Sequence, residues 1–192
     1  MTVLIAGLML FLGVHSVRIV ANGFRSTQIA RFGENAWKGL YSLASIAGLA
    51  LIVWGFGLAR QQPQVLWPTP VWLLHAAALL NLVAFVFIAA AYVPGDAIKA
   101  RLHHPMVLGV KVWAFAHLMA NNTLADLLLF GSFLLWAVLS YRAAKARDRA
   151  AGTTYAAGSP SRTVVTIAVG LAAWAAFAFW GHAALIGVRP LA

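Results

Sequence analysis

Apolar residues occur along the chain in six long runs separated by shorter polar segments. A helix needs about 20 apolar residues to cross a bilayer, because it rises about 1.5 Å per residue through a hydrocarbon core near 30 Å. The six runs cover residues 2–21, 39–59, 71–93, 105–120, 124–141 and 163–188. The pattern predicts an all-α, polytopic membrane protein with about six transmembrane helices, in a single integral-membrane domain over residues 1–192.

The fourth and fifth runs are separated by the polar triplet Asn121-Asn122-Thr123, which predicts a short helical hairpin. The fourth helix, at about 24 Å, is shorter than the hydrocarbon core. We therefore expect the turn to lie below the membrane surface, where its amide side chains satisfy helix ends that water does not reach. Lys111 either binds an anionic group or pairs with Asp126 across the hairpin.

Basic residues are concentrated in the three odd-numbered connections. These ten residues are Arg25, Arg31, Lys38, Lys99, Arg101, Arg142, Lys145, Arg147, Arg149 and Arg162. By the positive-inside rule the odd-numbered connections are cytoplasmic and both termini lie outside. The segment 143–162 passes from a basic run into Gly, Ser, Thr and Pro, and we interpret it as a flexible basic cytoplasmic loop.

Composition supports the membrane assignment. Hydrophobic residues make up 62% of the chain and charged residues only 9%, which excludes an ordinary soluble domain. The net charge of +10 would suggest nucleic acid in a soluble protein, but here the bases flank apolar runs. The expected partner is therefore the lipid bilayer and not nucleic acid. The absence of cysteine excludes disulfides, thiolate catalysis and Cys-ligated metal sites.

Six histidines are the informative polar residues, because polar groups at membrane depth need partners. His15 and His117 are placed on separate helices at similar depth, and two neutral imidazoles so placed are what a buried haem requires. Hydrogen bonding of each histidine to a neighbouring helix is the other interpretation, and it is the favoured one for His75, His103 and His182. The residues alone leave both open.

Helical phase separates two of the candidate residues. His104 and His117 are thirteen residues apart, which at about 100° per residue puts them on opposite faces and in different sites. Trp113 lies four residues before His117 on the same face, where it can pack against a flat ring. Arg18 lies one turn after His15, where it either pairs with a haem propionate or extends to lipid headgroups.

Three segments carry a resemblance to a known family. The segments LHHPMVLG (102–109), WAFAH (113–117) and FLGVHS (11–16) resemble the NnrU family of bacterial membrane proteins, over nearly the whole chain. The pairing of an HP-x-x-x-G helix entry with a second histidine thirteen residues on is fairly specific. The resemblance implies a bacterial inner-membrane protein associated with nitrite and nitric oxide metabolism, that is, with denitrification.

The NnrU family is in turn similar to the plastid 15-cis-zeta-carotene isomerase, in which histidines hold haem b in a redox-dependent way. That similarity implies haem b as cofactor, His15 and His117 as metal ligands, and a redox or cis/trans isomerase role with a hydrophobic substrate or a redox partner. The residues expected at the cofactor are His15, His117, Arg18, His104 and Trp113. The isomerase's further histidine falls near Phe56 and has no counterpart, which puts the isomerase mechanism in doubt.

Two alternatives belong to other classes. The HP-x-x-x-G entry is also similar to integral-membrane methyltransferases that use S-adenosylmethionine. Here, however, His103 stands where that family has Arg, and residues 141–151 offer only Asp148 in place of an acidic pair. The last alternative is a non-catalytic structural or regulatory membrane protein.

Overall fold

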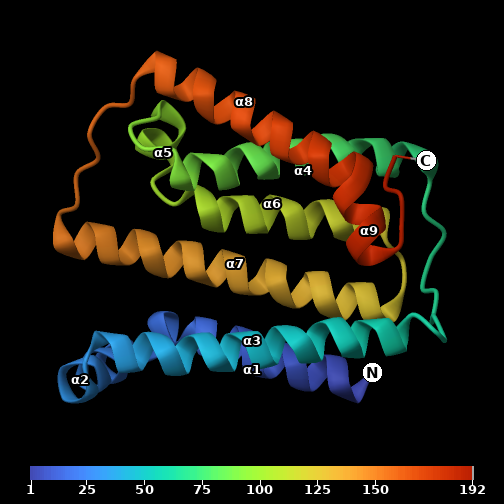
Figure 1. Ribbon diagram of the computed structural model, residues 1–192, viewed down its shortest axis with the longest axis horizontal. Coiled ribbons are helices and arrows are strands. Elements are labelled where there is room, and N and C mark those ends of the chain that lie inside the picture. Colours follow the sequence, from blue (N-terminus) through green and yellow to red (C-terminus); the bar gives the residue numbers. More distant parts are fainter. Residues whose placement is uncertain (192) are drawn as a thin grey trace.

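The computed structural model describes residues 1–191 and is built from helices (Figure 1). Their bounds are α1 Thr2–Val20, α2 Asn22–Phe32, α3 Glu34–Ala59, α4 Val71–Tyr92, α5 Ala97–Leu102, α6 Pro105–Ala120, α7 Leu124–Ala151, α8 Pro160–Ala176, the π-helical η1 Phe177–Gly181 and α9 His182–Ile186. Within the described residues five helical segments are long and apolar enough to cross a membrane, and α6 is the shorter apolar helix. The prediction of an all-α, polytopic membrane protein is confirmed.

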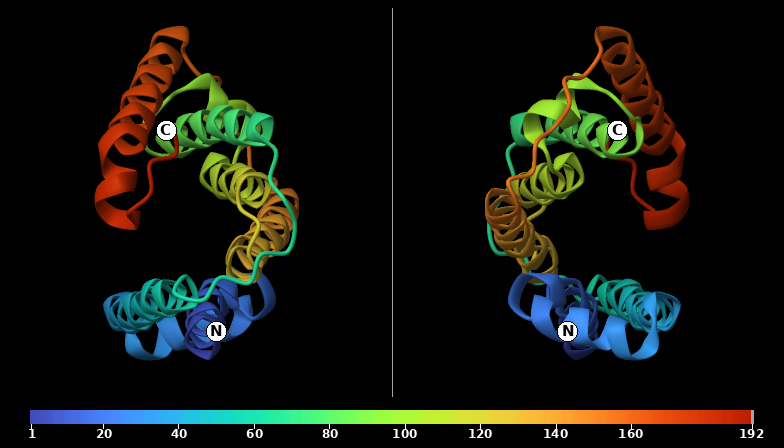
Figure 2. Two further views of the ribbon diagram at one scale, coloured as in Figure 1. Left: turned by 90° about the vertical axis from the view of Figure 1, so that its right-hand side faces the viewer. Right: turned by 90° about the vertical axis from the view of Figure 1, so that its left-hand side faces the viewer.

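The helices form an open, curved array. The α1–α3 pair packs on α7, α7 packs on α6, α6 packs on α4, and α4 packs on α8. Seen along the helices, α3 and the α8–α9 segment form the two ends of this curve (Figure 2). We call the end of the bundle that carries α2, α5 and residues 152–159 the basic end. The chain termini and the 121–123 turn lie at the opposite end (Figure 1).

Helices α1 and α3 approach each other closely through three glycines. A Cβ atom on Gly7 would lie 2.6 Å from the backbone nitrogen of Ile52, and one on Gly48 would lie 2.8 Å from that of Phe11. A Cβ atom on Gly55 would overlap the backbone of Leu4. Small residues at such contacts let helix backbones meet in lipid, where van der Waals packing drives association. This contact sets the position of α1 against α3.

The hairpin turn satisfies its own helix end. The Asn121 side chain donates to the carbonyl of His117 at 2.8 Å, as expected, and the Asn122 side chain donates to the carbonyl of Trp67 at 2.7 Å. Backbone hydrogen bonds also join the turn to the connection before α4, from Leu66 to Asn122 and from Leu124 to Gln64. The turn is therefore anchored to a distant part of the chain.

Asp126 has a different role from the pairing considered for it. It is buried and forms a capping box with Thr123 at the start of α7, in which each side chain accepts from the other residue's backbone N–H. The carboxylate is thus engaged by the cap, and Lys111 lies exposed on α6. Local capping prevails over a cross-hairpin ion pair because the first N–H groups of α7 need acceptors.

The predicted flexible loop at 143–162 is shorter than the sequence pattern indicated. Helix α7 continues through Ala151 and α8 begins at Pro160, so the connection covers only residues 152–159. The Ala, Lys and Arg residues after position 142 are strong helix formers, and the helix ends where Gly152 adopts the left-handed conformation. The first connection likewise contains a helix, α2, that the hydrophobic pattern did not indicate.

Two neighbouring glycines of α3 provide a matched test of the close contact. Gly55→Ala should lower the thermal unfolding midpoint in detergent, because its Cβ atom meets backbone and overpacking costs about 1–3 kcal/mol. Gly57 faces open space, so Gly57→Ala should leave the midpoint unchanged or raise it, since alanine is the better helix former by about 0.5–1 kcal/mol. Equal midpoints for the two variants would contradict the proposed packing.

Candidate functional site

His15 lies near the basic end of α1, among aromatic residues of three helices. Its Nδ1 donates to the carbonyl of Phe11 at 2.7 Å, one turn earlier. Its ring stacks on that of Phe11 with centroids 4.2 Å apart, and lies 5.1 Å from the ring of Tyr41 on α3 and 6.0 Å from that of Trp136 on α7. The imidazole is therefore held by one hydrogen bond and three aromatic neighbours.

His117 is held in the same way on the last turn of α6. Its Nδ1 donates to the carbonyl of Trp113 at 2.8 Å. The Trp113 ring lies 5.0 Å away, on the face that the four-residue spacing predicted, and the ring of Phe130 on α7 stacks at 4.6 Å. Both candidate ligands thus use the same local arrangement, a histidine bonded to the carbonyl four residues before it.

This hydrogen bond places a proton on Nδ1 of both imidazoles. A carbonyl only accepts, so Nδ1 is the donor, and in a neutral imidazole Nε2 then carries the lone pair. Metal-ligating histidines in proteins are commonly oriented by such a bond from the non-ligating nitrogen. His15 and His117 therefore each keep Nε2 outside this hydrogen bond, as an iron ligand requires.

The two imidazoles lie at different levels of the bundle, which differs from the expectation of similar depth. Their contacts on α7, Trp136 and Phe130, are six residues apart, or about 9 Å along the helix. A series of ring contacts connects the histidines. In order, the rings are His15, Phe11, Phe133, Trp113 and His117. We call this series the aromatic chain. The short α6 ends soon after His117, whereas His15 follows most of α1.

His103 and His104 form a polar cluster with residues of α7 and the connection after it. His104 Nε2 lies 2.7 Å from Oδ2 of Asp148, and the Tyr155 hydroxyl donates to the same oxygen at 2.9 Å. The His103 ring is parallel to that of Tyr155 with centroids 4.0 Å apart, and Lys145 donates to its Nδ1 at 3.2 Å. We call these five residues the polar cluster.

Sequence reasoning separated His104 from His117 correctly but missed the polar cluster. The available signal was that Asp148 is the single acidic residue among the bases of 141–151. Burial, together with the hydrogen bond to Asp148, raises the pKa of Tyr155, so its hydroxyl remains a donor at neutral pH. The cluster ties residues 152–159 to the start of α6.

A cleft of about 600 Å³ opens at the basic end, between the α1–α3 pair and the α6–α7 hairpin. We call it the basic cleft. Its lining includes His15, Arg18, Arg25, Lys38, His104 and Arg147. The Trp136 side chain also lines the cleft, and its buried Nε1 has no hydrogen-bond partner within residues 1–191. The cleft therefore joins two of the predicted cofactor residues, Arg18 and His104, to His15 but not to His117.

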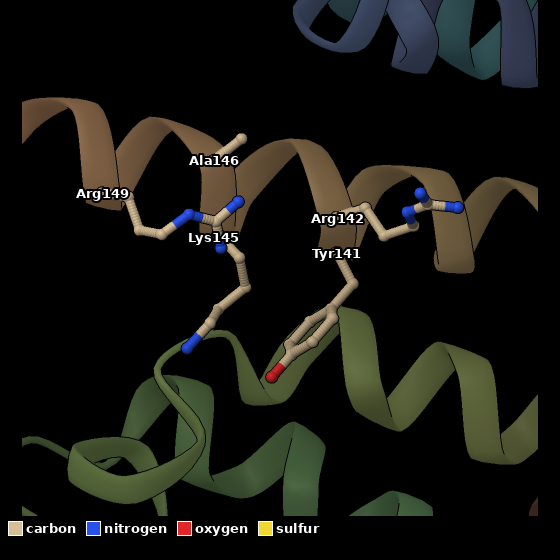
Figure 3. A pocket seen from close by; sticks show the side chains of 5 residues that line it. All are labelled: Tyr141, Arg142, Lys145, Ala146 and Arg149. Atoms are coloured by element: carbon tan, nitrogen blue, oxygen red, sulfur yellow. The ribbon is translucent and has the colours of Figure 1, made fainter.

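A second hollow, of about 510 Å³, lies on another face of α7. It is lined by α7 residues alone, and Lys145 extends from it toward the segment that joins α5 to α6 (Figure 3). Arg142 and Arg149 are exposed there. This hollow is a basic helix surface and does not lie between helices.

The two remaining histidines, His75 and His182, belong neither to the aromatic chain nor to the polar cluster. His75 is exposed on α4. His182 follows the π-helical turn, and its Nδ1 donates to the carbonyl of Val188 at 2.7 Å. It also lies within electrostatic range of His117. Its hydrogen bond is to its own C-terminal segment and not to a neighbouring helix.

Comparison with known protein families gives one match. The model of the family described as NnrU protein matches residues 3–190, which cover all of the helices named above except the first residue of α1. No curated protein and no solved structure matches the chain.

The polar cluster predicts how residues 152–159 respond to substitution. Tyr155→Phe should raise amide hydrogen–deuterium exchange in this segment roughly fivefold, because one hydrogen bond of about 1 kcal/mol is lost while the ring stack remains. Tyr155→Ala should raise it further. Thr154→Ala, at an exposed neighbour, is the control and should exchange like the parent protein. Unchanged exchange in Tyr155→Ala would show that the cluster does not hold the segment.

Proposed function

Since this chain belongs to the NnrU protein family, we propose that it is an integral membrane haem-b-binding protein whose iron ligands are His15 and His117. The observation that carries the proposal is the bond from Nδ1 to the preceding carbonyl at both residues, at 2.7 and 2.8 Å. It gives two imidazoles on separate helices the tautomer and the orientation of metal ligands.

The surroundings of the two histidines suit a flat, amphipathic group. The aromatic chain offers apolar ring faces beside both imidazoles, and Trp113 packs directly against His117. Arg18 lies one turn from His15 toward the basic cleft, where a guanidinium can pair with a propionate. His104 borders the same cleft through its bond to Asp148 and is assigned to the entrance rather than to the iron. A haem held by these residues would supply redox chemistry.

The residues between His15 and His117 would orient and shield a bound haem. Phe11 and Phe133, whose ring centroids are 5.7 Å apart, lie between the two imidazoles in the aromatic chain. The protein's part would be to orient the ligands through Phe11 and Trp113 and to exclude water with the aromatic chain.

Charge weighs against the methyltransferase alternative. S-adenosylmethionine has a net charge of +1, from a sulfonium, an ammonium and a carboxylate group, whereas four bases and one carboxylate, Asp148, line the cleft that the His-Pro helix entry borders. Like charges disfavour such binding. The structural or regulatory alternative predicts a folded but colourless protein, which the spectrum described below distinguishes.

The orientation in the membrane follows from the same charge pattern. We propose a bacterial inner-membrane location, with the basic end in the cytoplasm and both chain termini in the periplasm, because the ten bases of the odd-numbered connections all lie toward the basic end.

Reporter fusions test this orientation. A periplasmic reporter fused after Ala192, which lies outside the described residues, should be active. A tag inserted at Gly152, an exposed helix end, should be protected from impermeant reagents in intact cells. Labelling of the Gly152 tag from outside would reverse the assignment.

Absorption spectra test the haem proposal. The purified protein should contain haem in stoichiometric amount and, when reduced, show the sharp α and β bands of a six-coordinate low-spin iron. His15→Ala and His117→Ala should each lose haem or become high-spin and bind carbon monoxide, because a coordination position is opened.

Other histidines serve as matched controls for the spectra. His75→Ala and His182→Ala should leave the bands nearly unchanged, while His104→Ala should retain haem. Carbon monoxide binding by the unaltered protein would indicate ligation by one histidine. Parent-like spectra in both His15→Ala and His117→Ala would remove the proposed ligands.

A further inference from the structure

The basic cleft holds more positive charge than the chain itself neutralises. The sequence has four acidic residues, and of these only Asp148 lines the cleft. Asp96 caps α5 and Asp126 caps α7. Glu34 pairs with Lys38 at 2.9 Å, and Asp148 is bonded to His104 and Tyr155. No carboxylate within residues 1–191 forms a salt bridge with an arginine of the cleft.

Arg18 and Arg147 line the cleft from different helices, and neither forms a salt bridge within residues 1–191, although Asp148 lies within electrostatic range of Arg147. Arg147 is half-buried, and its Nη1 donates to the backbone carbonyl of Arg18 at 3.1 Å. The two guanidinium groups lie within electrostatic range of each other, so they repel. The positive-inside rule explains why bases gather at this end, and the hydrogen bond from Arg147 to Arg18 brings two of them together in one cleft.

A second observation concerns the interior of the same cleft. The indole Nε1 of Trp136 is buried there without an acceptor within residues 1–191. An unpaired buried donor costs about 1–3 kcal/mol, so such a group calls for a partner outside the chain. The Trp136 side chain thus borders the cleft with a buried, unpaired N–H, beside two arginines that form no salt bridge within residues 1–191.

We propose that the basic cleft binds a phosphate group between Arg18 and Arg147, on a ligand that comes from solution or from the lipid headgroup layer. Phosphate carries the charge of two guanidinium groups and has enough oxygens for two forked donors, whereas one carboxylate neutralises only one of them. The volume of about 600 Å³ is that of a small-molecule site. Arg18 is shared with the proposed propionate contact, whereas Arg147 has no part in the haem proposal, so the test below varies Arg147.

The first arm of the test uses soluble phosphate. Pyrophosphate is titrated into the purified full-length protein in neutral detergent, at ionic strength held constant with chloride, and the thermal unfolding midpoint is measured. We expect a saturable rise. Arg147→Gln should weaken the apparent affinity roughly tenfold, since one charge-assisted contact is lost. Arg147→Lys keeps the charge without the fork, so it should bind with intermediate affinity and remains informative if the Gln variant folds poorly.

The second arm uses lipid phosphate. The same proteins are placed in nanodiscs of phosphatidylcholine with or without phosphatidic acid. A midpoint that rises with phosphatidic acid, but not with pyrophosphate, assigns the site to lipid, whereas a response to pyrophosphate assigns it to a soluble ligand. Arg149→Gln removes the same charge two residues away, on the other hollow of α7, and should respond like the parent protein.

Two results would overturn the phosphate site. The first is a thermal unfolding midpoint that rises with neither pyrophosphate nor phosphatidic acid. The second is an equal loss of apparent affinity in Arg149→Gln and Arg147→Gln, which would show that the effect depends only on net charge. The haem spectrum is recorded on the same samples. Failure of the phosphate site therefore shows as an unchanged spectrum without stabilisation, and failure of haem binding shows as a colourless protein.

Discussion

Helix α7 is the element that joins the two halves of the molecule, and it depends on the capping box at its start. Thr123 and Asp126 satisfy backbone donors at the start of α7, directly after the hairpin turn. From that point α7 packs on α6 on one side and on α1 on the other. Both candidate haem ligands contact it, His117 through Phe130 and His15 through Trp136.

The two ends of α7 are specialised in different ways. Near its start the neighbours of His117 are aromatic, and the aromatic chain continues from there to His15. Near its end Asp148 joins the polar cluster and Arg147 enters the basic cleft. The apolar residues around the proposed cofactor thus lie on one side of the basic cleft, toward the start of α7, and the charged residues lie at the basic end. The proposed haem site and the proposed phosphate site meet at His15 and Arg18.

Residues 105–120 show where sequence reasoning succeeded and where it failed. Periodicity placed His104 away from His117 and set Trp113 beside His117, because both relations are local to one helix. It did not place His15 and His117 at different levels, since that depends on how far α1 is shifted along α7. It also did not find the pairing of His104 with Asp148, residues 44 positions apart that the hairpin brings together.

The sequence alone determined the fold class, the six helical segments, the hairpin and the charge difference between the two ends. These features follow from segment hydropathy, helix length and loop charge, which act within a few turns of chain. Only the tertiary structure decided the rest. The approach of α1 to α3 through Gly7, Gly48 and Gly55, the aromatic chain and the basic cleft all depend on contacts between distant segments. The hydrophobic pattern does not encode them, because lipid accepts an apolar face in any rotation and packing alone selects one.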